Sequence, residues 1–100
     1  MDTVKIETGD IVRSINGRDA GGLFFAVRVD GEYLELADGR GRRIEKPKRK
    51  KLKHTQRVAY SESRAAEKLR SGEKITNAEL RRAISELGGD ADNEGGMQVG

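Results

Sequence analysis

The chain has 100 residues, 34% hydrophobic and 37% charged, so it can build one small folded domain of roughly 60 residues with less ordered appendages. It contains no cysteine, which excludes disulfides and thiol catalysis, and no apolar run near the roughly 18 residues that span a bilayer. The N-terminus lacks the apolar segment of a signal peptide. We therefore expect a soluble, cytoplasmic protein.

Short apolar runs separated by turn residues follow one another along the first 60 residues. In the clearest run the alternating residues Leu23, Phe25, Val27 and Val29 share one predicted buried face, and Asp30-Gly31 after it predicts a hairpin. Pro47 belongs at an edge or a corner, because it cannot donate to a ladder. Five short strands with tight turns predict a mainly β fold, a small antiparallel barrel. The expected strands are 9–15, 23–29, 32–37, 42–46 around Ile44, and 52–60.

Helical patterns replace the strand pattern after Tyr60. Residues 61–72 are rich in helix formers, and Gly72 ends them. A second helix begins at Thr76, which forms a capping box with Glu79, and Ile75 is placed to contact Leu80. Its apolar stripe is Leu80, Ile84 and Leu87, and Gly88 stops it. The predicted divisions are a barrel (1–60), a helical extension (61–88) and a disordered acidic, glycine-rich tail (89–100).

Positive charge is concentrated in one band, residues 40–57, which holds ten basic residues and the single carboxylate of Glu45. Its centre is the run KPKRKKLKH at 46–54. Such a run can be a solvated surface or a nuclear localisation patch, or it can bind a polyanion. Because this band lies inside the strand pattern, we expect a scaffold to hold it against nucleic acid. Few aromatic residues are available for base stacking, so RNA recognition through backbone and shape is favoured.

Other candidate sites are weaker. His54, the only histidine, is either a half-buried strand residue or a contact to a phosphate or base, and without a second histidine or a cysteine no metal site is expected. The segment GRDAGG (17–22) lacks the final residues of a P-loop and predicts a turn. No pairing of a nucleophile with a base is visible, so we expect no catalytic residues, no cofactor and no small-molecule substrate.

Three segments together resemble a known family: Gly17-Arg18-Asp19-Ala20-Gly21, then Arg42-Arg43, and then Pro47-Lys48-Arg49-Lys50 with Lys53-His54. The stretch from Gly9 to about Arg57 resembles the small bacterial KOW-domain RNA-binding proteins. It is also similar to a KOW-bearing protein of the archaeal and eukaryotic large ribosomal subunit. The resemblance implies an SH3-like barrel, no enzymatic activity, and binding to ribosomal RNA or to the ribosome.

The resemblance also implies which residues face the RNA. KOW domains of NusG-type elongation factors can instead bind proteins, so docking on a ribosomal protein or on RNA polymerase is the alternative function. Docking on a protein needs an exposed apolar patch, whereas the predicted face is nearly all cation, which favours RNA. The RNA-facing positions implied are Arg18, Arg42, Arg43, Lys46, Lys48, Arg49, Lys50, Lys51, Lys53 and His54, to which the forked donors of the band add Arg40.

Overall fold

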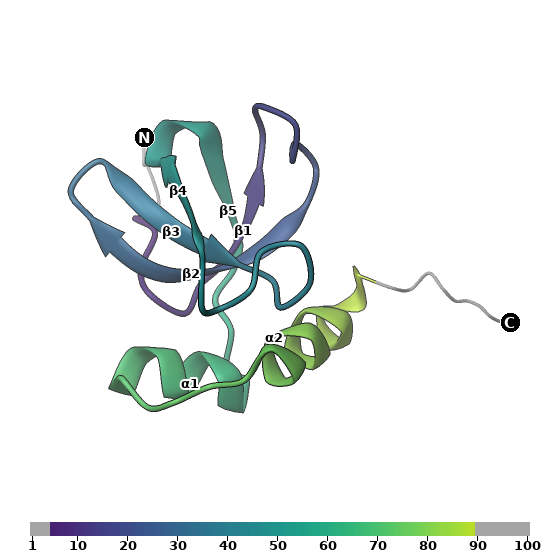
Figure 1. Ribbon diagram of the computed structural model, residues 1–100. Helices are drawn as coiled ribbons and strands as arrows, with labels where there is room; N and C mark the ends of the chain where they lie inside the picture. The colour runs from purple at the N-terminus through teal and green to yellow at the C-terminus, as the bar shows by residue number, and fades with distance from the viewer. Residues whose placement is uncertain (1–4, 90–100) are drawn as a thin grey trace, which may run out of the picture.

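A computed structural model describes residues 5–89 of the chain. Five strands form one antiparallel sheet, in the spatial order β4-β3-β2-β1-β5. A three-residue 3-10 turn, η1 (Leu52–His54), connects the two edge strands directly, and the curved sheet makes a small barrel-like body (Figure 1). The described part is thus largely β, as predicted. The strands are β1 (Ile11–Ser14), β2 (Leu23–Asp30), β3 (Tyr33–Ala37), β4 (Lys48–Lys51) and β5 (Thr55–Ala59).

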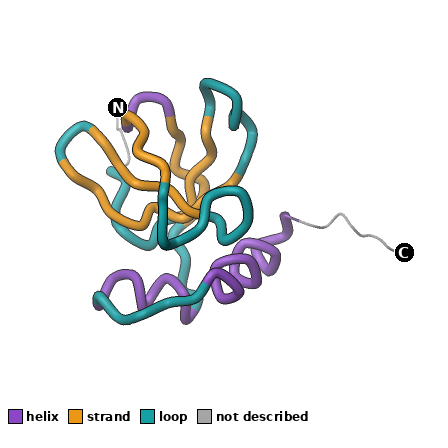
Figure 2. The backbone as a smooth tube through the Cα atoms, in the orientation of Figure 1, coloured by secondary structure: helices purple, strands orange, loops and turns teal. Residues whose placement is uncertain are grey.

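Two short helices run along one side of the sheet, beneath the strands in Figure 2. They are α1 (Arg64–Ser71) and α2 (Asn77–Ile84), and α2 continues into a π-helical turn, η2 (Ser85–Gly89). None of the helices within residues 5–89 has the length and apolar character needed to cross a bilayer.

Both faces of the sheet are covered by apolar residues. The barrel cluster is formed by strand residues alone and consists of Val12, Phe24, Ala26, Leu34 and Leu36. The helix-side cluster joins Ile11, Phe25 and Ala37 of the sheet to Ala65, Ala66 and Leu80 of the two helices. Because α1 and α2 bury these alanines and Leu80 against the strands, the helices share a core with the sheet.

The prediction that four alternating residues of β2 share one buried face is only partly right. Phe25 lies in the helix-side cluster, with Leu23 and Val27 packed against it, but Val29 packs against the barrel cluster. The reason is an irregularity in the pairing of β2 with β3 between Ala26 and Arg28. An extra residue at such a bulge reverses the side on which later side chains point.

The fourth strand is not at 42–46, as predicted, but at Lys48–Lys51, directly after Pro47. Ile44 packs instead against the helix-side cluster, and its backbone N–H donates to Oδ1 of Asn77 in α2, at 2.7 Å. The helix therefore satisfies a donor that a neighbouring strand would otherwise satisfy. The last strand is also shorter than predicted, because residues 52–54 form η1 and His54 lies in that turn.

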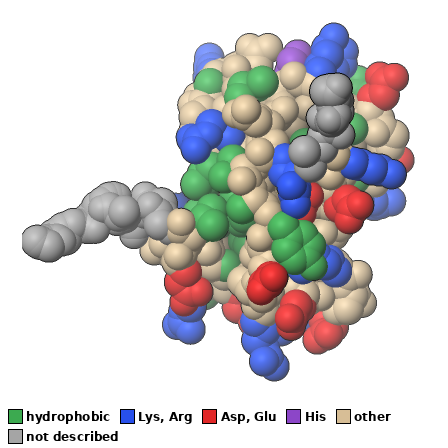
Figure 3. Space-filling view, turned by 180° about the vertical axis from the view of Figure 1, so that it is seen from behind, with side chains coloured by type: hydrophobic (Ala, Val, Ile, Leu, Met, Phe, Trp, Pro, Cys, Tyr) green, Lys and Arg blue, Asp and Glu red, His purple; other side chains and the backbone are tan. Residues whose placement is uncertain are grey.

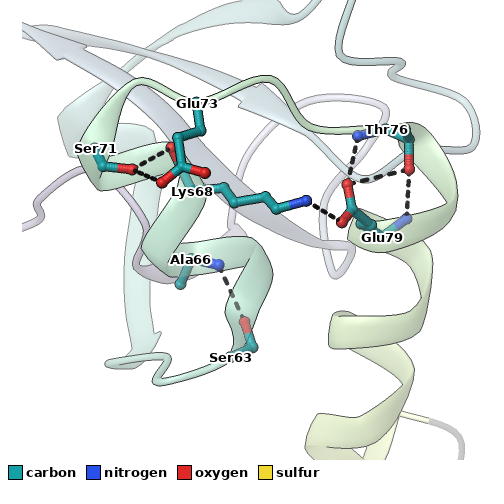
Figure 4. A network of polar contacts seen from close by, with 7 residues as sticks. All are labelled: Ser63, Ala66, Lys68, Ser71, Glu73, Thr76 and Glu79. Carbon is teal, nitrogen blue, oxygen red and sulfur yellow. Dashed lines mark hydrogen bonds and ion pairs between the residues drawn. The ribbon is translucent and has the colours of Figure 1, made fainter.

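The helix signals in the sequence are confirmed at the level of single hydrogen bonds (Figure 4). Thr76 Oγ1 accepts from the N–H of Glu79 at 3.2 Å, and Glu79 Oε1 accepts from the N–H of Thr76 at 2.9 Å, which completes the capping box. Lys68 Nζ of α1 donates to Glu79 Oε2 at 2.6 Å, linking the two helices. The hydrogen bond from Lys68 is the main cause that holds the pKa of Glu79 below its ordinary value.

The apolar stripe of α2 ends earlier than predicted. Leu80 is fully buried and Ile84 packs against the helix-side cluster, whereas Leu87 is 42% exposed. The change to π-helical winding at Ser85 explains this, because a π-helix has more residues per turn than an α-helix and so shifts the positions that follow out of phase. The predicted disordered tail lies, apart from Gly89, outside the described residues.

Candidate nucleic-acid interface

The centre of the basic band forms β4, one of the two edge strands of the sheet. β4 consists of Lys48, Arg49, Lys50 and Lys51 and pairs only with β3 among the described strands. Its side chains alternate, so that Arg49 and Lys51 are exposed and Lys50 is buried. Lys50 lies opposite Leu34 of the barrel cluster, and Lys51 lies opposite the half-buried Tyr33. A charged edge strand also discourages pairing with other chains.

Lys50 does not belong to the exposed basic surface, although it is predicted to face RNA. Its side chain is 8% exposed, and Nζ donates to Asp19 Oδ1 at 2.9 Å and to the carbonyl oxygen of Asn16 at 2.7 Å. These bonds attach the β1–β2 loop, residues 15–22, to the edge strand. Lys50 therefore positions the loop, and its charge is satisfied within the chain.

The carboxylate of Asp19 is the negatively charged partner of Lys50 in this contact. Burial raises the pKa of its carboxyl, but the hydrogen bonds from Lys50 and Ser14 and the positive charge of Lys50 outweigh burial, so the pKa lies below its ordinary value of 3.8. Its second oxygen, Oδ2, is buried without a hydrogen bond and lies 4.0 Å from Nζ of the half-buried Lys48. Arg18, the exposed neighbour of Asp19, is thereby held near β4.

A second basic segment, the loop of residues 38–47, is held in place by α2. Arg81 Nη1 donates to the carbonyl oxygen of Gly39 at 2.7 Å. The side chain of Asn77 makes two further bonds: its Oδ1 accepts from the N–H of Ile44, and its Nδ2 donates to the carboxylate of Glu45 at 2.9 Å. Gly39 has a φ of +80° and sits so close to the carbonyl of Asn77 that a Cβ there would collide with it. The N-terminal turn of α2 thus determines the shape of this loop.

The loop directs its cations outward. Asp38 Oδ1 accepts from the N–H groups of Arg40 and Arg42, at 2.9 and 3.0 Å, and both arginine side chains are exposed. Arg43 and Glu45 approach to 3.7 Å, but both side chains are mostly exposed, so water and salt screen this pair. Arg40, Arg42 and Lys46 make no ion pair within the described part of the chain.

Beyond β4 the basic surface continues into η1. Lys53 is exposed, and His54 is half-buried, its carbonyl oxygen accepting from the N–H of Ile15 at 3.0 Å. On β4 the guanidinium of Arg49 lies 4.2 Å from the ring centre of Tyr33, a cation–π contact that orders an otherwise flexible side chain. Tyr33 is thus engaged within the protein rather than open for base stacking.

The structure therefore collects most of the predicted positions along one edge, which we name the basic edge. Lys48 and His54 are half-buried and lie next to it, and Lys50 is buried beneath it. The RNA-facing residues predicted from the sequence do not include three residues that position the edge, namely Asp19, Asn77 and Arg81. Each of the three bonds to a partner more than 30 residues away along the chain, so no local pattern could reveal its role. The exposed members of the basic edge are Arg18, Arg40, Arg42, Arg43, Lys46, Arg49, Lys51 and Lys53.

Within residues 5–89 no group of three or more histidine, cysteine or acidic side chains is arranged to hold a metal ion. No protein-family model matches the chain, and no curated protein is significantly similar to it.

Proposed function

We propose that this protein binds RNA through the basic edge, by contacts to the phosphate backbone. The observation that carries the proposal is that the exposed cations are mounted on ordered structure. They lie on a sheet strand, on a loop bonded to α2, and on a second loop bonded to Lys50. A preordered array of cations loses less conformational entropy on binding than a flexible basic tail does.

The chemistry of the edge suits folded RNA. Each phosphate neutralised by Lys or Arg releases condensed counterions, so affinity falls steeply with salt. Arginines such as Arg40 and Arg42 can make two parallel hydrogen bonds to one phosphate, which lysine cannot. We further propose that the curved sheet is an SH3-like barrel of the KOW type. The resemblance of residues 9–57 to KOW proteins supports ribosomal RNA or the ribosome as the target.

The test is a triple charge reversal on the basic edge, Arg49→Glu with Lys51→Glu and Lys53→Glu. These side chains are exposed and make no ion pair in the described structure, but Arg49→Glu removes the contact with Tyr33 and places a carboxylate opposite Glu35, so urea unfolding must first show that the variant is folded. We expect RNA affinity to fall by at least about 100-fold at about 50 mM salt, and the slope of log K against log salt to flatten by about 3. Fluorescence anisotropy with ribosomal RNA fragments, across a salt series, measures both.

A matched control reverses three exposed cations of the helical side, Arg64→Glu, Lys74→Glu and Arg82→Glu. It changes the net charge by the same amount, so it separates a located interface from general electrostatic attraction. We expect a smaller loss of affinity and a slope close to that of the wild type. Equal effects of the two triple variants, or no effect of the first, would refute binding through the basic edge.

Docking on another protein is the second candidate, and an apolar patch favours it. Hydrophobic side chains gather across the middle of the face turned away in Figure 1 (Figure 3). Ile15, Val58, Tyr60 and Leu87 are the exposed large hydrophobic residues of the described chain. Ribosome co-sedimentation after ribonuclease treatment discriminates the two, because retention on the protein remnant supports docking and release supports RNA binding.

A further inference from the structure

An open groove adjoins the basic edge at the end of the barrel where η1 meets the turn between β2 and β3. Its volume is about 690 Å³, within the range of pockets that hold small organic ligands. A second hollow of about 380 Å³ shares Gly31, Leu52 and Lys53 with it, so the two lie side by side. The groove is lined by Lys5, Ile6, Val29, Gly31, Leu52, Lys53, Thr55, Gln56 and Arg57.

The groove combines an apolar floor with a cationic border. Ile6, Val29 and Leu52 pack against the barrel cluster and present their remaining surface to the groove. Lys5 and Lys53 line it, and Lys51 lines the adjoining hollow together with Glu32. Neither Lys51 nor Lys53 makes an ion pair in the described structure.

Two further polar side chains of the groove are engaged within the protein, while Gln56 is an exposed neutral amide. Arg57 Nε bonds the buried Asp10 at 3.0 Å, and Thr55 Oγ1 donates to the carbonyl oxygen of Leu52 at 2.8 Å. The charge free to meet a ligand is therefore that of the lysines. A ligand that fits this groove has a flat or apolar part and an attached negative charge.

We propose that the groove receives one unpaired nucleotide of the bound RNA. The base would rest on Ile6, Val29 and Leu52, and the flanking phosphates would lie against Lys51 and Lys53. This inference rests on the proposed function and extends it, since the groove begins where β4 ends. Bases displaced from a helix are commonly held against apolar side chains, whereas paired bases are inaccessible to such a groove.

The consequence is a preference among RNAs. A fully paired RNA would contact the basic edge alone, while an RNA with a bulged nucleotide would fill the groove as well. We expect the bulged RNA to bind about tenfold more tightly at equal salt, in line with the removal of about 60 Å² of apolar surface from water. The salt dependence of the two RNAs should be nearly the same, because their phosphate contacts are shared.

The experiment compares two RNA hairpins that differ only in one bulged 2-aminopurine nucleotide. Variants Ile6→Thr and Val29→Thr make the partly exposed floor polar without adding volume, and they should abolish the tenfold preference while preserving binding of the paired hairpin. Lys53→Gln should weaken both hairpins to a similar degree. The fluorescence of 2-aminopurine reports whether the base changes its environment on binding to the wild type.

A second measurement needs no variant. Adenosine monophosphate added to the full-length protein should shift the methyl NMR signals of Ile6, Val29 and Leu52, and inorganic phosphate should not. Equal affinity for the two hairpins, or equal methyl shifts from phosphate and nucleotide, would overturn the groove assignment. Failure to bind either hairpin would instead overturn the proposed RNA-binding function itself.

Discussion

At the scale of single residues, identical side chains in the basic band have opposite roles. Lys51 is exposed on the basic edge, whereas its neighbour Lys50 is buried and paired with Asp19. Removal of one partner from such a pair leaves the other charge buried without compensation. The contribution of Lys50 to RNA binding is therefore indirect, through the loop that carries Arg18.

Asp19→Asn should lower the free energy of unfolding by about 1–3 kcal/mol near pH 7, because it leaves the Lys50 ammonium without its anion. The pKa of Asp19 is lowered in the folded protein, so its stabilisation is present above the ordinary value of 3.8 and is lost as pH falls through the lower folded value. Urea unfolding at about pH 7 and about pH 3 measures this. The difference between wild type and variant should shrink at the lower pH.

The control is Asp30→Asn at the exposed C-terminal end of β2, where no ion pair is present among the described residues. It should change stability little at either pH. A destabilisation by Asp19→Asn of the same size at both pH values would show that the carboxylate charge is not what stabilises the loop.

At the scale of elements, α2 acts on the interface through the loop 38–47. Asn77→Ala removes the bonds to Ile44 and Glu45 without removing a cation. We expect about tenfold weaker RNA binding, because ordering even one loop residue on binding costs about 1–2 kcal/mol. The salt slope should stay constant, and hydrogen exchange of residues 39–45 should become faster.

Thr76→Ala is the matched variant for this element. It removes the helix cap one residue away, which costs about 1 kcal/mol of stability, but Thr76 makes no bond to the loop. Thr76→Ala should have little effect on the rate of amide hydrogen exchange in residues 39–45. Equal acceleration by both variants would mean that the loop responds to helix stability in general rather than to Asn77.

At the scale of the whole molecule, sheet and helices should unfold together, because they share the helix-side cluster. Leu80→Ala should reduce the free energy of unfolding by about 2–5 kcal/mol, the usual cost of such a truncation in a core. Leu87→Ala, at a 42% exposed position, should cost about 0.5 kcal/mol or less. Backbone NMR signals of β2 and α2 followed in urea should give coincident transitions. Separate transitions would show that the helices form an independent unit.

Local signals in the sequence account for a large part of this fold. The hairpin at Asp30-Gly31, the capping box at Thr76 and the end of α1 at Gly72 are all confirmed. Each depends on residues within about four positions of one another, so short-range chemistry is enough to predict it. The position of the fourth strand and the side of Val29 were mispredicted, because a distant helix and a bulge decide them.

The sequence by itself determined that positive charge would be dense between residues 40 and 57 and that this density would lie within a β framework. Only the tertiary structure decided which of these cations face solvent. Lys50 and Lys51 are neighbours on one strand and so point to opposite sides of it, and the carboxylate of Asp19, 31 residues away, meets the lysine on the buried side. Burial and ion pairing depend on contacts between distant segments, and no local pattern encodes them.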